Sequence, residues 1–174
     1  MKRPAADVLK KAAKIQLLLL DVDGVLTDGR IIIDDRGIET KQFYVRDGQG
    51  IALLLRAGIK VGFLSARKSA SVRRRAKELG VDLVCEGVRD KLEAYCEIKR
   101  SVGFKDDQIA YVGDDIIDLP ILRHAGLAVS VRDGWEGLKR TVDYVTSASG
   151  GQGAVREVAE LLLKTQTKWH LLID

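Results

Sequence analysis

The sequence predicts an α/β protein built on a doubly wound parallel sheet, and three observations support this fold class. Short apolar runs of strand length alternate with amphipathic helical segments along the whole chain. The first run, Ile15 followed by Leu17–Leu20, is almost continuously apolar, which is typical of a strand buried on both faces. Two acids, Asp21 and Asp23, follow this strand at the carboxyl edge, where open α/β sheets bind ligands. We therefore expect a Rossmann-like sheet whose carboxyl edge carries the chemistry.

The further elements are predicted from the same alternation, in chain order. A surface helix is expected over 5–14, before the first strand. After that strand, the β-rich runs 30–33 and 38–45 flank an Asp-Asp-Arg-Gly turn and indicate a hairpin. Asp47 is expected to cap a helix that ends at Arg56, before Gly58. The remaining strands are expected at 60–65, 81–87, 108–115, 126–131 and 143–146, and the remaining helices at 69–79, 89–101, around Pro120 and at 151–166.

Length and composition indicate one globular domain over residues 1–174. The chain is 46% hydrophobic and 31% charged, and none of its apolar runs approaches the length of a membrane span. Cys85 and Cys96 lack the spacing of a metal or redox motif, which predicts reduced thiols in a cytoplasmic protein. A net charge of +4 with only 5% aromatic residues disfavours nucleic-acid binding. We expect a small anionic partner and no association with membranes.

The acids after the first strand need an electrostatic partner. An unpaired buried charge is costly, so a cation, a phosphate group or acid–base chemistry is expected to compensate Asp21 and Asp23. Gly24 permits a sharp turn or a close approach by a ligand. The simpler alternative for these acids is an exposed turn.

The segment D-V-D-G-V-L-T, which begins at Asp21, resembles the nucleophile motif of the haloacid dehalogenase-like phosphotransferases. The later motifs of that family follow in order: Ser65 in F-L-S-A-R, Lys91 in G-V-R-D-K, and Asp114 in Y-V-G-D-D-I-I-D. Each of these is a weak signal alone, because serines at strand ends and lysines on helices are common. Together, over nearly the whole chain, they identify the family.

The resemblance implies phosphoryl transfer that depends on Mg²⁺. Asp21 would attack phosphorus and form an aspartyl-phosphate, and Asp23 would protonate the leaving alcohol and then activate water. Ser65 would bind a phosphoryl oxygen, while Lys91 would offset the charge of phosphate and nucleophile. The ligands of Mg²⁺ would be Asp21, the backbone carbonyl of Asp23, and Asp114.

Two further acids of the fourth motif, Asp115 and Asp118, have two possible roles. They could orient the metal-bound waters and Lys91. Capping of the following helix is the competing interpretation, since acids favour that position.

The chain has no room for the cap domain that most members of this family insert over the active site. Its closest pattern is the capless branch of 3-deoxy-D-manno-octulosonate 8-phosphate phosphatases, which carry D-V-D-G-V-L-T-D-G-R, V-R-D-G-x-G-I, V-G-D-D-x-I-D and G-G-x-G-A-V-R-E. This branch implies a homotetramer assembled through the hairpin at 30–45, in which neighbouring subunits help to close the site. An apolar hairpin edge would otherwise stay bare. The apolar tail, 168–174, is expected to dock in a neighbour or to pack on the core.

Carried over by position, the resemblance also implies a set of substrate-binding residues. Arg67 and Arg75 would meet anionic groups of the substrate, because the planar guanidinium binds carboxylates bidentately. Helix capping or a surface position is the alternative for Arg67. The segment that would line the sugar-phosphate site consists of Tyr44, Val45, Arg46, Asp47 and Gly48.

Two departures from the branch leave the substrate open. The chain has Ala52 and Gln152 at positions where the branch often carries a basic residue. The first alternative is therefore a sialic-acid-type 9-phosphate phosphatase, and a broadly specific phosphatase is another. A catalytically silent scaffold and a polynucleotide phosphatase are the remaining alternatives, although the intact catalytic set argues against the scaffold.

Overall fold

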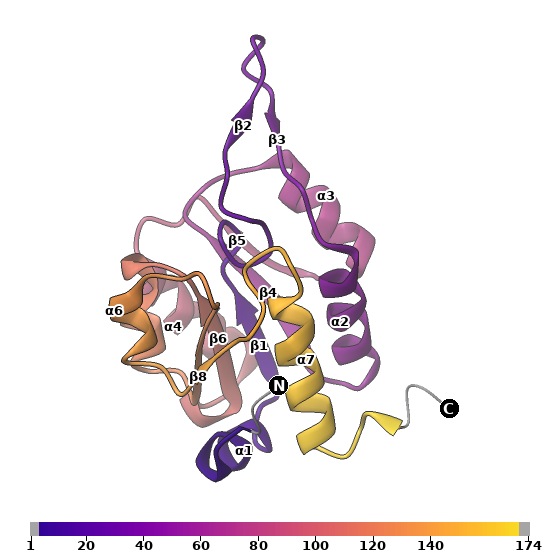
Figure 1. The fold of residues 1–174 in the computed structure, drawn as a ribbon, viewed down its shortest axis with the longest axis vertical. Helices are drawn as coiled ribbons and strands as arrows, with labels where there is room; N and C mark the ends of the chain where they lie inside the picture. Colours follow the sequence, from indigo (N-terminus) through magenta and orange to yellow (C-terminus); the bar gives the residue numbers. More distant parts are fainter. Residues whose placement is uncertain (1–3, 171–174) are drawn as a thin grey trace.

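The computed structural model describes residues 4–170, and its central feature is a six-stranded parallel sheet between two layers of helices (Figure 1). The strand order is interrupted at β1, which lies between strands from different parts of the chain. This arrangement brings the carboxyl ends of three central strands side by side and confirms the predicted doubly wound fold. In order across the sheet, the strands are β5 (Leu83–Glu86), β4 (Lys60–Ser65), β1 (Leu17–Leu20), β6 (Ile109–Gly113), β7 (Leu127–Ser130) and β8 (Tyr144–Val145).

The central strand β1 is buried on both faces because its leucines alternate between two cores. Leu18 and Leu20 belong to the core on one side of the sheet, whereas Leu17 and Leu19 belong to the core on the other. All four side chains are inaccessible to solvent. The two-sided burial predicted from the apolar run is therefore confirmed.

The helices form two layers, one on each face of the sheet. The first layer contains α1 (Ala6–Ala12), α2 (Val45–Arg56), α3 (Ala70–Leu79) and α7 (Ala154–Thr165). The second contains α4 (Lys91–Val102), α5 (Leu119–Leu122) and α6 (Glu136–Lys139). Short 3₁₀ turns, η1 (Asp106–Gln108) and η2 (Ile116–Asp118), flank β6. Among the described residues, no helix has the length and apolarity that crossing a bilayer requires.

The predicted elements occur within three residues of their expected bounds, with one exception in the region of the hairpin. Gly80 ends α3 with a φ of 74°, and Pro120 lies in the first turn of α5, as the sequence indicates. Trp169, in the predicted tail, packs against the core and lies 5.2 Å from the Arg156 guanidinium. Residues 171–174 of that tail are outside the described range.

The predicted hairpin forms, but its paired part is short. β2 (Ile32–Ile33) pairs with β3 (Glu39–Thr40), and the side chain of Asp34 accepts hydrogen bonds from the N–H groups of Arg36 and Ile38 in the turn. The second predicted strand extends too far, because Val45 already belongs to α2.

The prediction that Asp47 caps α2 is wrong, because α2 begins two residues earlier, after Tyr44. The carboxylate of Asp47 is instead directed to α7. It accepts hydrogen bonds from the N–H groups of Gly153 and Arg156, at 3.1 and 2.7 Å, where that helix begins. Burial raises the pKa of Asp47, and these hydrogen bonds oppose the rise. Asp47 therefore joins α2 to the N-terminus of α7.

We expect Asp47→Ala to lower the free energy of unfolding by about 1–3 kcal/mol, because buried N–H groups of α7 lose their acceptor. Urea denaturation measures this change. Asp47→Asn retains an acceptor oxygen and should cost less, and Glu93→Ala, which removes an exposed acid from the first turn of α4, serves as the matched control. Equal stability of Asp47→Ala and the wild type would contradict the capping role.

Candidate active site

The residues of the predicted motifs meet at the carboxyl edge of the sheet. Asp21 follows β1, Ser65 ends β4, Asp114 follows β6, and Lys91 is the first residue of α4. Parallel neighbours place these strand ends together, which explains why residues far apart in sequence share one site. They border a pocket of about 260 Å³, whose full lining is Asp21, Asp23, Gly29, Ser65, Ala66, Arg67, Lys91, Asp114, Asp115 and Ile117.

At the base of this site, a buried lysine lies between two carboxylates. Lys91 Nζ is 2.9 Å from Asp21 and 2.6 Å from Asp118, and the three side chains are at most 6% exposed. The Tyr111 hydroxyl donates to the same oxygen of Asp118 at 2.6 Å. The other oxygen of Asp118 accepts the N–H of Asp114 at 3.0 Å. Asp118 thus orients Lys91 and fixes the backbone that carries Asp114.

The carboxylates of this cluster repel one another in a poorly solvated site. Burial, with the charge of Asp118, raises the pKa of Asp21 to about 6, although Lys91 opposes the rise. Burial and the charges of Asp21 and Asp118 raise the pKa of Asp114 to about 8. Burial alone would lower the pKa of Lys91, but the carboxylates outweigh it and the net shift is upward. Lys91 therefore stays protonated, yet one ammonium does not balance three acids.

The cluster fits a hard divalent cation. Oxygens of Asp21, Asp114 and Asp118 lie within 4.8 Å of one another, and carboxylate oxygens are the donors that Mg²⁺ prefers. When all three carboxylates are ionised, Lys91 leaves two negative charges, which a divalent cation would offset. Asp21 and Asp114 line the pocket, whereas Asp118 is occupied by Lys91, Tyr111 and backbone N–H groups. Asp21 and Asp114 are accordingly the better-placed ligands.

Gly24 is required by the close packing of this cluster. A Cβ atom at that position would lie 2.0 Å from a carboxylate oxygen of Asp114, and the φ of 89° is itself unfavourable for other residues. The close approach expected at Gly24 is therefore made by a side chain of the protein.

A second group of charged residues lies at the pocket, and two of its members, Glu39 and Lys41, were not predicted from the sequence. Lys41 donates to Asp23 and lies 3.1 Å from the carboxylate of Glu39. Glu39 also pairs with Arg67, whose Nε is 3.9 Å from Asp23, and the hydrogen bond from Arg67 is the main cause of the lowered pKa of Glu39. We call Asp23, Glu39, Lys41 and Arg67 the outer charge network. The signal was the spacing of Glu39 and Lys41, two residues apart, which puts both side chains on one face of an extended segment.

The remaining motif residues have distinct positions. Ser65 is buried at the pocket, and its Oγ accepts the N–H of Arg67 at 3.1 Å. Asp115 is exposed and accepts the N–H of Ile116 at 2.7 Å, as the first residue before η2. This geometry favours capping for Asp115, whereas the contacts of Asp118 favour orientation of Lys91.

The other predicted substrate-binding residues do not line this pocket, as far as the described chain extends. Arg75 lies against Gly48, where an added Cβ would meet the guanidinium at 2.2 Å, and pairs with Glu78 at 3.4 Å. Asp47 is directed to α7, as described above. The segment 44–48 and Arg75 therefore do not border the pocket of their own chain, and their contact with substrate stays a prediction.

A larger hollow, of about 630 Å³, opens at the opposite end of the sheet, near Gln16 and Gln108, which precede β1 and β6. Among the described residues that line it, Asp107 is the one acid. This hollow lacks the crowded carboxylates that a metal or phosphoryl transfer requires, so the smaller pocket is the candidate site.

We expect metal binding at this site to depend on pH, because protons compete with the cation for Asp21 and Asp114. For both acids the pKa in the folded protein exceeds the ordinary value of 3.8, so their ionisation destabilises the metal-free fold. Relative to Asp114→Asn, the metal-free wild type should lose stability as the pH rises from about 4 to about 8.

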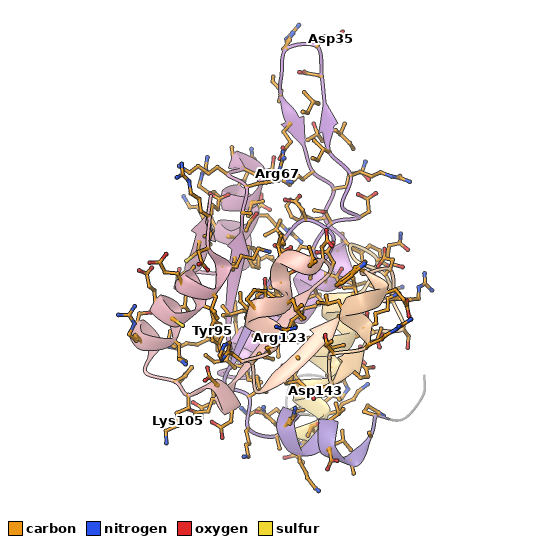
Figure 2. All side chains as sticks on the ribbon, turned by 90° about the vertical axis from the view of Figure 1, so that its left-hand side faces the viewer. Asp35, Arg67, Tyr95, Lys105, Arg123 and Asp143 are labelled. Atoms are coloured by element: carbon orange, nitrogen blue, oxygen red, sulfur yellow. The ribbon has the colours of Figure 1, made fainter. Side chains whose placement is uncertain are left out.

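The increase in melting temperature on adding Mg²⁺ should correspondingly be larger at pH 8 than at pH 6, and differential scanning calorimetry measures it. Asp114→Asn should show a smaller and flatter response. Asp35→Asn, which removes an exposed acid at the tip of the hairpin (Figure 2), is the control. A response to Mg²⁺ that is equal at both pH values would contradict this assignment.

The chain is similar over most of its length to proteins of one family. A model of the haloacid dehalogenase-like hydrolases matches residues 84–158. A 3-deoxy-D-manno-octulosonate 8-phosphate phosphatase of Yersinia pestis is 43% identical over 164 residues, which cover 94% of this chain and 88% of that protein.

Solved structures agree in fold. The phosphatase of the same name from Moraxella catarrhalis, in complex with magnesium, phosphate and KDO, has a TM-score of 0.94 and 44% identity, and the match covers 96% of each chain. A cobalt-bound form from Haemophilus influenzae has a TM-score of 0.88 and 41% identity, covering 91% of this chain and 92% of that one. The chain therefore belongs to the haloacid dehalogenase-like hydrolases, within the family of the 3-deoxy-D-manno-octulosonate 8-phosphate phosphatases.

Proposed function

We propose that this protein is a Mg²⁺-dependent phosphatase that hydrolyses 3-deoxy-D-manno-octulosonate 8-phosphate in the synthesis of lipopolysaccharide precursors. The observation that carries the proposal is Lys91, buried between Asp21 and Asp118 at the edge of the sheet. The relatives from Yersinia pestis and Moraxella catarrhalis indicate the substrate. The free thiols of Cys85 and Cys96 support a reducing, cytoplasmic location.

The proposed reaction has two steps, and the chain supplies a group for each. Asp21 attacks phosphorus, the bond from phosphorus to the sugar oxygen breaks, and an aspartyl-phosphate forms. Asp23 donates a proton to the departing sugar oxygen and then takes a proton from the water that attacks the aspartyl-phosphate. Lys91 and Ser65 bind phosphoryl oxygens. Bound Mg²⁺ would supply the positive charge that lets a phosphate dianion approach the Asp21 carboxylate.

The ion pair with Lys91 also favours the ionised form of Asp21, which a nucleophile needs. Its positive charge opposes the upward shift that burial causes in the pKa of Asp21. Asp118 and Tyr111 hold Lys91 in place from the side away from the pocket, which neither of them lines. The cluster is therefore preorganised before substrate binds.

The departures at Ala52 and Gln152 lie outside the catalytic cluster. Ala52 belongs to α2 and Gln152 precedes α7, and neither lines the pocket. Arg67 does line it, with 42% of its side chain exposed. We propose that Arg67 receives the carboxylate of the sugar acid, for which a guanidinium is geometrically suited.

We further propose a homotetramer assembled through the hairpin. The hairpin projects from the body of the protein (Figure 1), and Ile31, Ile32, Ile33 and Ile38 are 43–59% exposed on it. Exposed apolar surface on an edge hairpin favours association. A neighbouring subunit could also supply the substrate contacts predicted for Arg75 and the segment 44–48, which do not line the pocket of their own chain.

We expect phosphate release from a substrate panel to require Mg²⁺ and to stop with a chelator. The panel comprises the eight-carbon 8-phosphate, a nine-carbon sialic-acid-type 9-phosphate, glucose 6-phosphate and a 3′-phosphorylated oligonucleotide. The largest kcat/KM should belong to the eight-carbon substrate. Asp21→Asn should reduce kcat at least about 10⁴-fold, because the amide is a poor nucleophile. Turnover of the panel at one low rate would refute the sugar assignment, and a silent wild type would refute the enzyme.

We expect the wild type to sediment as a tetramer at micromolar concentration. Ile31→Asp combined with Ile33→Asp should dissociate it, because charges would replace apolar surface on one face of the hairpin. Arg36→Asp, which adds an acid at the turn without removing apolar surface, is the matched control. A monomeric wild type in sedimentation velocity would refute the assembly.

A further inference from the structure

We propose that Lys41 is a positioning residue for phosphoryl transfer, and that through it the hairpin becomes part of the catalytic machinery. Lys41 holds the carboxylate of Asp23 in the orientation that proton transfer to the departing oxygen requires. This inference rests on the phosphatase function proposed above.

The side chain of Lys41 is buried. Its side chain is 1% exposed, although most of the hairpin around it is open to solvent. An ammonium group removed from water is costly unless carboxylates compensate it. The carboxylates of Asp23 and Glu39 compensate the charge of Lys41, and Glu39 Oε1 lies 3.1 Å from its Nζ.

Lys41 contacts Asp23 from outside the pocket. Asp23 and Arg67 line the pocket, whereas Lys41 and Glu39 do not. Lys41 therefore acts on Asp23 from outside the space that substrate would fill. It is placed to orient the acid and is not placed to bind the phosphate.

Among the described residues, Lys41 makes the closest side-chain contact with the carboxylate of Asp23. Asp23 lies in the irregular segment between β1 and the hairpin, so no regular element fixes its side chain. Its other ion-pair partner in the described part of the chain, Arg67, is more distant, with Nε at 3.9 Å. A general acid has to stay within hydrogen-bonding reach of the oxygen it protonates. Lys41, which directly follows β3, supplies the close contact that can hold Asp23 there.

Lys41 is also connected to Arg67 through Glu39. Glu39 pairs with both Lys41 and Arg67, so its carboxylate is shared by the two cations. Figure 2 shows Arg67 beside the base of the hairpin, with Asp35 at its far end. The outer charge network contains two cations and two carboxylates and is balanced without a metal, unlike the cluster around Lys91. Because Glu39 and Lys41 belong to the hairpin region, the arrangement of the network depends on the position of the hairpin.

The test compares two leaving groups by kcat/KM, which reports the step that phosphorylates Asp21. A sugar phosphate needs protonation of its departing oxygen, whereas nitrophenolate leaves 4-nitrophenyl phosphate readily without a proton. Lys41→Met should lower kcat/KM about 10–100-fold on the eight-carbon 8-phosphate, which is part of the whole contribution of a general acid. On 4-nitrophenyl phosphate the same variant should lower kcat/KM less than about 3-fold. Lys41→Arg should restore the ratio between the substrates.

A double-mutant cycle separates orientation of Asp23 from a structural role. In the Asp23→Asn background, Lys41→Met should cause no further loss on the sugar phosphate. Arg36→Met, which removes an exposed cation from the same hairpin, controls for net charge. If Lys41→Met does not fold by circular dichroism, Lys41→Ala, which also removes the ammonium group, replaces it in both comparisons.

The outcomes are distinguishable. An inactive wild type on both substrates would refute the phosphatase proposal itself. With an active wild type, equal losses on both substrates, additive losses in the cycle, or no loss would each overturn the role of Lys41.

Discussion

The contact on which the site depends is the ion pair that Lys91 makes with Asp21 and Asp118. The fold delivers three carboxylates to one edge of the sheet, and burial deprives them of the water that would solvate their charge. Burial and the mutual repulsion of the acids raise the pKa values of Asp21 and Asp114. When all three acids are ionised, Lys91 leaves two negative charges, which a divalent cation would offset. A divalent cation bound here would offset this imbalance and so let a phosphate dianion approach.

Around this cluster, the outer charge network is electrically balanced and includes residues from the hairpin. The two groups of charges therefore serve different purposes. The cluster around Lys91 carries the excess negative charge that a metal ion would offset. The outer charge network orients Asp23 and Arg67, which line the pocket. Since the same hairpin carries the exposed isoleucines, assembly and catalysis become physically linked in the proposed tetramer.

The sequence was sufficient for the sheet and for the acids at its edge, because both are local patterns. A strand of four leucines has to be buried on both faces, and the residues that follow parallel strands have to meet at one edge. The contact of Lys41 with Asp23 could not be predicted in the same way, since it depends on where the hairpin lies relative to the segment that follows β1. Asp47 shows the same limit. Its carboxylate has the local character of a cap, but its partners are N–H groups of a helix more than one hundred residues later.

The most direct test of the account is to trap the covalent intermediate. Substrate labelled with ³²P at the phosphate would be mixed with enzyme and Mg²⁺, quenched in acid within milliseconds, and the protein reduced with borohydride, which converts an aspartyl-phosphate to homoserine. The account predicts acid-stable label on the protein and homoserine at position 21 in the peptide mass spectrum. Label on Ser65, or turnover without any covalent label, would contradict the central claim that Asp21, paired with Lys91, is the nucleophile.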